Sequence, residues 1–241
     1  HSTWAGSGVV NARYIDMGSF YQLTLANGAT LSINLSGNYP LSNVNSDGFN
    51  PGGNSTATLH LSGAAQSLDP GVRRVPNLRL SGGSKTIGSN SQFLLYGNLI
   101  VDAGATFNAA TNNPTVYAYR DLVLNGSFLA GTNWWRFDGT VPQTISAAAT
   151  FRNLVLNNAQ GLTVGGNLTI GNASDGRLEL TSGRLTTGVN AVVVLRACQS
   201  GAWLGRSVGA WVNGQVRLAL PNSASNCVYP IGDQNNYAPL T

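Results

Sequence analysis

Apolar and polar residues alternate in short triplets through the second half of the chain. Four of them lie between Trp134 and Leu185: Leu154-Val155-Leu156, Leu162-Thr163-Val164, Leu168-Thr169-Ile170 and Leu178-Glu179-Leu180. In each triplet the outer residues fall on one side of an extended strand and the middle residue on the other. Gly, Asn, Asp or Ser residues, which tolerate tight corners, bound the triplets. The pattern predicts short strands joined by tight corners.

The same order of segments occurs earlier in the chain. Residues 59–68 match 135–145, residues 75–80 match 151–156, and residues 97–101 match 166–170. Strand triplets return roughly every 20 to 24 residues, at Leu78, Leu99 and Leu122 and again at Leu154 and Leu178. One such unit cannot bury its own apolar side, so units of this size stack into a shared core. We expect an all-β fold, a parallel β-solenoid.

Three regions follow from the regularity of this pattern, and we expect them to form one continuous body. We predict irregular or capping strands in residues 1–58, the solenoid repeats in residues 59–195, and a C-terminal cap or assembly segment in residues 196–241. Within the first region, Asn27-Gly28 predicts a hairpin or a corner between turns. Residues 38–54, rich in Asn, Gly, Ser and Pro, predict a long loop.

Asparagine stands just before the strand triplets at matching places in the repeats. Asn77, Asn98, Asn153 and Asn167 occupy these positions. Stacked amides satisfy both their donors and their acceptors, so we expect an asparagine ladder that bonds turn to turn.

Charged residues make up only 9% of the 241 residues, against roughly 25% in ordinary globular proteins. The net charge of +4 comes from twelve arginines and one lysine, Lys85, with only Arg73 and Arg74 adjacent. We expect scattered, solvated charges, and no nucleic-acid partner, because such proteins cluster basic residues on one face. No segment has the eighteen or so apolar residues of a transmembrane helix.

Several features suggest an exported protein. The chain opens on His1 without an initiator Met or an apolar leader, from which we expect a processed N-terminus. Cys198 and Cys227 could close a loop by a disulfide in an oxidising compartment, the alternative being two buried thiols. Neither His1 nor His60 is near them in sequence, so we expect no metal site. The expected location is extracellular, at the cell surface or in a matrix.

Parallel β-helices include pectin-degrading enzymes, so we looked for their chemistry. Asn45-Ser-Asp47-Gly48 is similar to a polygalacturonase segment, but the adjacent Asp pair, the Gly-His-Gly and the Arg-Ile-Lys of that family are missing. The nine acidic residues are far apart in sequence, although a solenoid could bring Asp102 and Asp121 together on neighbouring turns. We expect no catalysis, no metal and no cofactor.

Aromatic residues appear among Gly and Ser after residue 195. A solenoid needs a distinct end, and this segment could serve either as a cap or as a docking face for another copy. The residues expected to make assembly or ligand contacts are Trp203, Trp211, Tyr229 and Tyr237. Exposed tryptophans, Trp134-Trp135 included, could instead stack on sugar rings.

The C-terminal half resembles a known group of proteins. Residues 138–146 (DGTVPQTIS), 151–170 (FRNLVLNNAQGLTVGGNLTI), 178–185 (LELTSGRL), 211–216 (WVNGQV) and 229–241 (YPIGDQNNYAPLT) together resemble the large surface and adhesin-like β-solenoid proteins that Bacteroidota secrete. The resemblance implies a location at the cell surface or in a matrix and no catalysis. In that family more chain follows the last segment, so we expect either cleavage at Thr241 during export or one module of a longer protein.

These observations favour a non-catalytic, exported structural or adhesive β-solenoid, as a filament subunit that stacks head to tail with copies of itself. The alternative is a carbohydrate-binding or carbohydrate-active parallel β-helix with surface glycans as partners. A third hypothesis is that the chain is a passive spacer in a giant adhesin.

Overall fold

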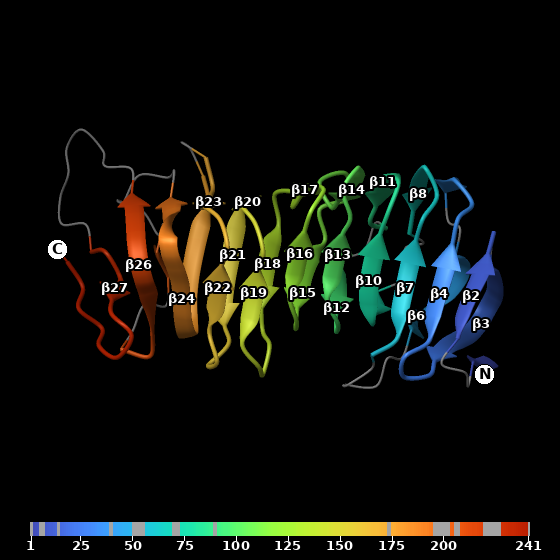
Figure 1. Ribbon diagram of the computed structural model, residues 1–241, viewed down its shortest axis with the longest axis horizontal. Coiled ribbons are helices and arrows are strands. Elements are labelled where there is room, and N and C mark those ends of the chain that lie inside the picture. Colours follow the sequence, from blue (N-terminus) through green and yellow to red (C-terminus); the bar gives the residue numbers. More distant parts are fainter. Residues whose placement is uncertain are drawn as a thin grey trace. The chain divides into compact units, whose positions relative to one another are not determined.

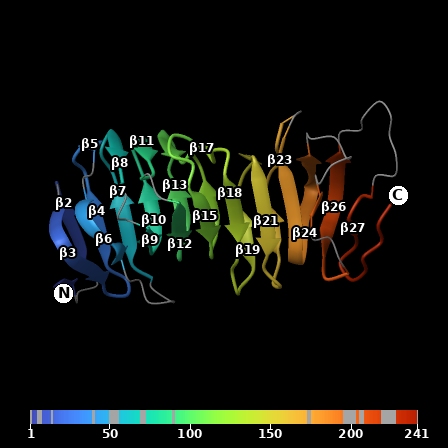
Figure 2. The same cartoon turned by 180° about the vertical axis from the view of Figure 1, so that it is seen from behind.

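The computed structural model describes most of the chain. It covers residues 2–4, 8–13, 15–38, 41–49, 56–68, 73–88, 91–172, 175–194, 203–204, 208–218 and 228–240. The chain divides into two compact units, His1–Gly131 and Thr132–Thr241. Each is a stack of parallel strands, and the described residues form about eight solenoid turns in all (Figures 1 and 2). The predicted all-β parallel solenoid is confirmed.

The first unit consists of strands that stack in separate parallel ladders. The first ladder is β2 (Val9–Ala12), β4 (Thr30–Ile33), β7 (Thr58–Leu61), β10 (Asn77–Leu80), β13 (Leu99–Val101) and β16 (Leu122–Leu124). The second is β5 (Gly37–Asn38), β8 (Ala65–Ser67), β11 (Gly83–Thr86), β14 (Ala105–Asn108) and β17 (Ser127–Leu129). The third is β9 (Arg74–Val75), β12 (Gln92–Leu95) and β15 (Thr115–Ala118). A further sheet joins β1 (Ser2–Trp4), β3 (Ile15–Leu25) and β6 (Leu41–Phe49).

In the second unit one long strand, β24 (Arg177–Val194), belongs to three ladders in succession. Its first part lies between β21 (Asn153–Asn157), which follows β18 (Trp134–Phe137), and β25 (Trp203–Leu204). Its middle lies between β22 (Leu162–Val164), which follows β19 (Gln143–Ile145), and the first half of β26 (Ala210–Leu218), which β27 (Ile231–Gly232) follows. Its end lies between β23 (Leu168–Ile170), which follows β20 (Ala149–Phe151), and the second half of β26.

The register of the ladders agrees with the spacing in the sequence. Leu78 pairs with Leu99, Leu99 with Leu122, and Leu154 with Leu178. These leucines are at most 1% exposed, so each stacks on its equivalent in the next turn and forms a continuous apolar column. Full burial of one such side chain stabilises the fold by about 1.5–3 kcal/mol relative to exposure.

One triplet departs from the alternation. Val155, the middle residue of Leu154-Val155-Leu156, is buried although it was expected to face solvent. Its partners in the neighbouring turns are Arg136 and Glu179, whose longer side chains flank it on the outer side of the ladder.

Two expectations for the N-terminal region are resolved by strand pairing. The prediction of a loop over residues 38–54 is wrong for residues 41–49, which form β6 and pair with β3. Ladder hydrogen bonds hold these Asn, Ser and Gly residues extended despite their low strand propensity. Asn27-Gly28 is a corner and not a hairpin, because β4 after it pairs in parallel with β2 and β7, and Gly28 has a φ of 76°.

The asparagines bond from turn to turn, but to backbone groups instead of to one another. Asn77 Nδ2 donates to the carbonyl of Ala57 at 3.0 Å, and Asn77 Oδ1 accepts from the backbone N–H of Asn98 at 2.8 Å. Asn98 Oδ1 accepts in turn from the N–H of Asp121 at 3.1 Å. Each asparagine thus replaces a ladder hydrogen bond at the corner, where the strands have ended.

The glycine that precedes Asn98 and Asn167 has a steric role. A Cβ on Gly97 would lie 2.4 Å from Asn77 Oδ1 and 2.5 Å from Asn77 N, and one on Gly166 would lie 2.2 Å from Ala148 N. Close packing of one corner on the next explains why Gly97-Asn98-Leu99 and Gly166-Asn167-Leu168 recur in the sequence.

We predict that Gly97→Ala destabilises the first unit by about 1–3 kcal/mol, because the added methyl group forces two packed corners apart. The measurement is the urea midpoint of unfolding. Gly8→Ala is the matched control, since nothing lies within 4 Å of a Cβ at Gly8. Equal midpoints for the two variants would contradict the tight corner.

Candidate functional site

The residues singled out near the C-terminus fall partly outside the described chain. Cys198 and Cys227, the expected disulfide partners, both lie outside the described residues, so their pairing stays a prediction. Trp203 begins β25, where it pairs with Leu178, and its side chain is outside the described part. Trp211, Tyr229 and Tyr237 are described, and they come together around β26 and β27.

A small antiparallel element covers the first half of β26. Tyr229 bridges to Leu240 and Gly232 bridges to Tyr237, and these two bridges are antiparallel. The backbone N–H of Tyr229 donates to the carbonyl of Leu240 at 2.7 Å. Between them, β27 adds in parallel to Val212 and Asn213 of β26.

Trp211 holds this element against the solenoid. Its side chain is 8% exposed, its Nε1 donates to the carbonyl of Asp233 at 2.9 Å, and its ring centroid lies 6.3 Å from that of Tyr237. The N–H groups of Asn235 and Asn236 donate to Asp233 Oδ1 at 2.7 Å, and these hydrogen bonds hold the pKa of Asp233 below its ordinary value. The predicted aromatic residues Trp211 and Tyr237 are thus packed together at this turn.

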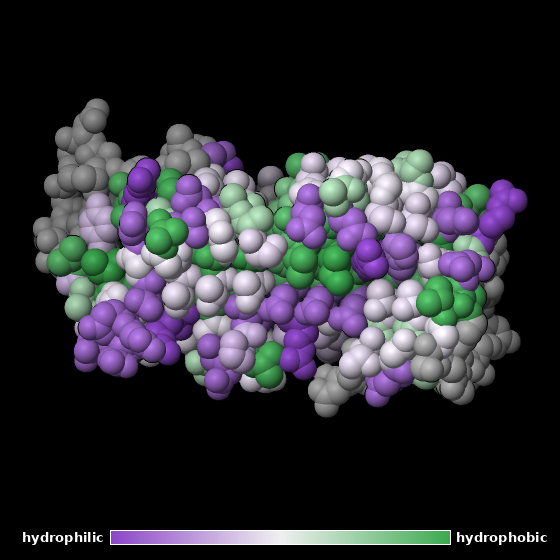
Figure 3. Space-filling view, viewed as in Figure 1, coloured by the Kyte–Doolittle hydropathy of each residue, from purple (hydrophilic) through white to green (hydrophobic). Residues whose placement is uncertain are grey.

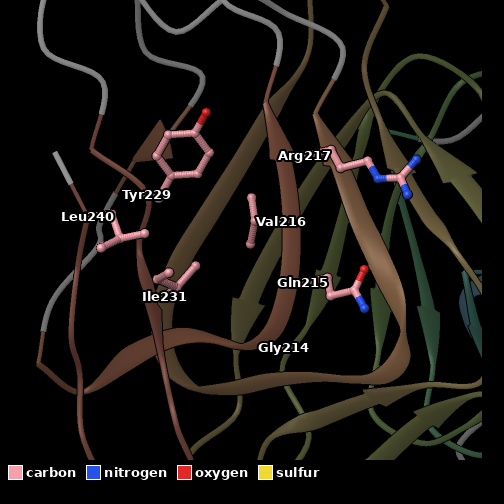
Figure 4. A pocket seen from close by; sticks show the side chains of 7 residues that line it. All are labelled: Gly214, Gln215, Val216, Arg217, Tyr229, Ile231 and Leu240. Atoms are coloured by element: carbon pink, nitrogen blue, oxygen red, sulfur yellow. The ribbon is translucent and has the colours of Figure 1, made fainter.

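A cavity of about 470 Å³ opens beside the second half of β26. It is lined by Gly214, Gln215, Val216, Arg217, Tyr229, Ile231 and Leu240. Figure 4 shows Val216, Ile231, Leu240 and the Tyr229 ring around one space, whereas Gln215 and Arg217 extend away from it. Tyr229, one of the predicted contact residues, therefore borders a mostly apolar hollow.

The cavity lies where the core of the solenoid is incompletely covered. Val216 and Leu218 pair with Val192 and Val194, which are 0% and 1% exposed. Val216 and Leu218 continue the same inward columns but are only half-buried. Val216 and Leu218 are therefore less well covered than the valines they pair with.

Among the described residues, the outer edge of this half-strand has no partner either. β27 pairs with Val212 and Asn213, and among the described residues no strand pairs with the outer side of Gln215–Leu218. An edge of this kind presents unpaired N–H and C=O groups to which another strand can add. We call Gln215–Leu218 the C-terminal edge.

The first ladder of the N-terminal unit also has an edge without a described partner, at β2. Within the described part of the chain β2 pairs only with β4. Val10 and Ala12 are half-buried, whereas their partners in β4, Leu31 and Ile33, are 3% and 0% exposed. We call Val9–Ala12 the N-terminal edge.

A row of polar side chains follows the outward side of the first ladder. Ser32 Oγ lies 3.2 Å from His60 Nδ1, and Ser81 Oγ lies 2.8 Å from His60 Nε2. Burial and then the nearby Arg79 guanidinium lower the pKa of His60, against the opposing effect of Asp102. This environment therefore favours the neutral imidazole.

A Ser–His pair can in principle activate a nucleophile, but catalysis also needs an orienting group and an oxyanion site. Asp102 accepts from Arg79 Nε at 2.9 Å instead of orienting His60. The row crosses a ladder in which backbone N–H groups bond to the next strand, as Asn77–Leu80 do with Thr58–Leu61. The arrangement is suited to holding successive turns together.

The acidic residues considered for catalysis are kept apart by the register. Asp102 follows β13 and Asp121 precedes β16, so the parallel pairing of these strands places the two residues at opposite ends. Over the described chain, no group of three or more His, Cys, Asp or Glu side chains gathers in a way that could hold a metal ion. Nor does that part of the chain contain a helix with the length and hydropathy of a membrane span.

The prediction that Lys85 is a solvated charge is wrong. The side chain is 0% exposed and points inward from β11, in the column of Gln66 and Phe107. Its Nζ donates to the carbonyls of Gly63 at 2.7 Å, Ser81 at 2.8 Å and Gly82. The carbonyl groups of two successive corners thus surround one ammonium group.

Sequence reasoning missed Lys85 because its neighbours in sequence, Ser84 and Thr86, are polar and give no apolar alternation. The signal that could have indicated burial is Gly82-Gly83, whose φ angles are both 59°. Two successive left-handed residues make a tight corner that brings carbonyl groups together. Ser32, His60 and Ser81 were missed because they come from three turns.

We predict that the Lys85 ammonium has a pKa of about 8, because burial disfavours the charged form relative to the ordinary value of 10.5. Since this is the only lysine, [13C]lysine labelling gives a single resonance to titrate. The same resonance in urea-unfolded chain is the control and should titrate near the ordinary value.

The same shift makes stability depend on pH. Between about pH 8 and 10.5 the unfolded chain binds more protons than the folded one, so the free energy of unfolding rises with pH in this window. Lys85→Met should cost about 1–3 kcal/mol at pH 7 by leaving buried carbonyls unpaired. The difference between wild type and variant should widen from pH 8 to 10.5, and a constant difference would contradict the buried charge.

Comparison with known proteins adds no relative on which a function could be based. No family model, no curated protein and no solved structure matches this chain.

Proposed function

We propose that this chain is a non-catalytic structural protein that acts outside the cell, as a β-solenoid subunit that associates with further copies through the ends of its ladders. The observation that carries the proposal is the open C-terminal edge, Gln215–Leu218, beside a mostly apolar cavity of about 470 Å³. Half-buried Val216 and Leu218 at this edge are the place where a further turn would bury apolar surface.

The composition supports this assignment. With 9% charged residues, the exterior relies on Ser, Thr, Asn and Gly for its polarity. The face shown in Figure 3 mixes pale, hydrophilic and hydrophobic groups. Weakly charged surfaces repel one another little, which favours association of like chains at high local concentration.

The carbohydrate-binding alternative finds little support in the described aromatic residues. Tyr96 and Tyr119 stack with ring centroids 5.1 Å apart and planes inclined by 7°. Each of these rings therefore has one face covered by the other. Of the tryptophans that could stack on sugars, Trp135 and Trp211 are 0% and 8% exposed and Trp134 is half-buried.

We predict that the purified protein assembles into filaments as its concentration rises, which negative-stain microscopy and sedimentation velocity would detect. Because backbone pairing and apolar contacts are screened little by salt, assembly should persist between about 0.05 and 0.5 M NaCl. Monomers at every concentration would contradict the proposal and favour a spacer. Monomers that bind a glycan array would favour the carbohydrate-binding alternative.

A further inference from the structure

We propose that the joint between copies is the addition of β2 of one copy to the C-terminal edge of another, as a parallel strand. This inference rests on the proposed function and names the surfaces through which it operates. Residues Val9–Ala12 would pair with Gln215–Leu218, four residues against four.

The C-terminal turn is incomplete in a way that fits such a strand. β27 begins a further turn over Val212 and Asn213, and in the described part of the chain no strand continues that turn over Gln215–Leu218. An added β2 would occupy this place beside β27. The joint would extend the parallel ladder that connects β23 to β24 and β24 to β26 in the second unit.

The inward and outward positions of the two strands match. In β2, Val10 and Ala12 continue the inward columns of Leu31 and Ile33, whereas Val9 is 64% exposed. In the C-terminal edge, Val216 and Leu218 continue the inward columns, whereas Gln215 and Arg217 are exposed. Pairing Val10 with Val216 and Ala12 with Leu218 buries both apolar pairs, and a shift of one residue would bury Asn11 instead.

The polarity of the ladders makes the joint heterologous. β4 lies on the C-terminal side of β2 in its ladder, so the open side of β2 faces the N-terminal direction of the stack. The open side of β26 faces the C-terminal direction, because β24 lies on its other side. The joint therefore brings together two different surfaces, and a heterologous contact that does not close produces a filament.

The test uses two variants of the full chain that each block one edge. Val10→Asp places a carboxylate in the inward column of the N-terminal edge, and Val216→Asp does the same at the C-terminal edge. Each variant alone should remain monomeric at concentrations at which wild type forms filaments. Mixed in equal amounts, they should form a heterodimer and nothing larger, because each retains one intact and complementary edge.

Val189→Asp is the matched control, because Val189 is 91% exposed and lies on neither edge, so this variant should form filaments like wild type. Circular dichroism and urea midpoints check that each variant folds. Should one of the first pair fail to fold, Ala12→Lys and Leu218→Lys introduce a charge at the neighbouring inward positions, with a side chain long enough to reach solvent. The same outcomes are expected of that pair.

Sedimentation velocity separates failure of this joint from failure of the proposed function. Filaments from either edge-blocked variant alone, or a mixture that stays monomeric while wild type polymerises, would overturn the joint and leave the proposed function standing. Wild type that stays monomeric would overturn both.

Discussion

The parallel pairing of each turn with the next is the interaction on which this structure depends. Apart from β3, β6, β24 and β26, the strands contain two to five residues each, too few to form a sheet or to bury a core by themselves. Stacking supplies both the backbone partners and the apolar neighbours, as the column Leu31, Leu59, Leu78 and Leu99 shows. Stability is therefore a sum of contacts between adjacent turns, and the first and last turns have one neighbour fewer.

Close stacking restricts the corners more than the strands. Gly97 and Gly166 have no room for a side chain, and Asn77 and Asn98 supply the hydrogen bonds that the ladders no longer provide at those positions. Lys85 supplies such hydrogen bonds from the interior. Its ammonium group binds carbonyls of two corners that would otherwise be buried without a donor. Burial disfavours the charged form of this group and thereby lowers its pKa.

The same dependence on neighbours accounts for the function that we propose. A turn that lacks a neighbour leaves backbone groups and apolar side chains available, as Val216 and Leu218 do beside the cavity and Val10 and Ala12 do at β2. A second copy supplies the same backbone hydrogen bonds and apolar contacts that hold successive turns together. By contrast, the polar row of Ser32, His60 and Ser81 forms its hydrogen bonds within the chain, which suits a structural role.

The sequence by itself determined the short strands around Leu78, Leu99 and Leu122 and their register, because period-two alternation and a spacing of roughly 20 to 24 residues are properties of one turn repeated. These leucines can be aligned from their spacing alone. The tertiary structure alone decided what lies between turns: the burial of Lys85, the contact of His60 with two serines, the conversion of residues 41–49 into a strand, and the open edge at Gln215–Leu218. These features depend on which residues of different turns meet, and local pattern contains no information about a partner that comes from another turn.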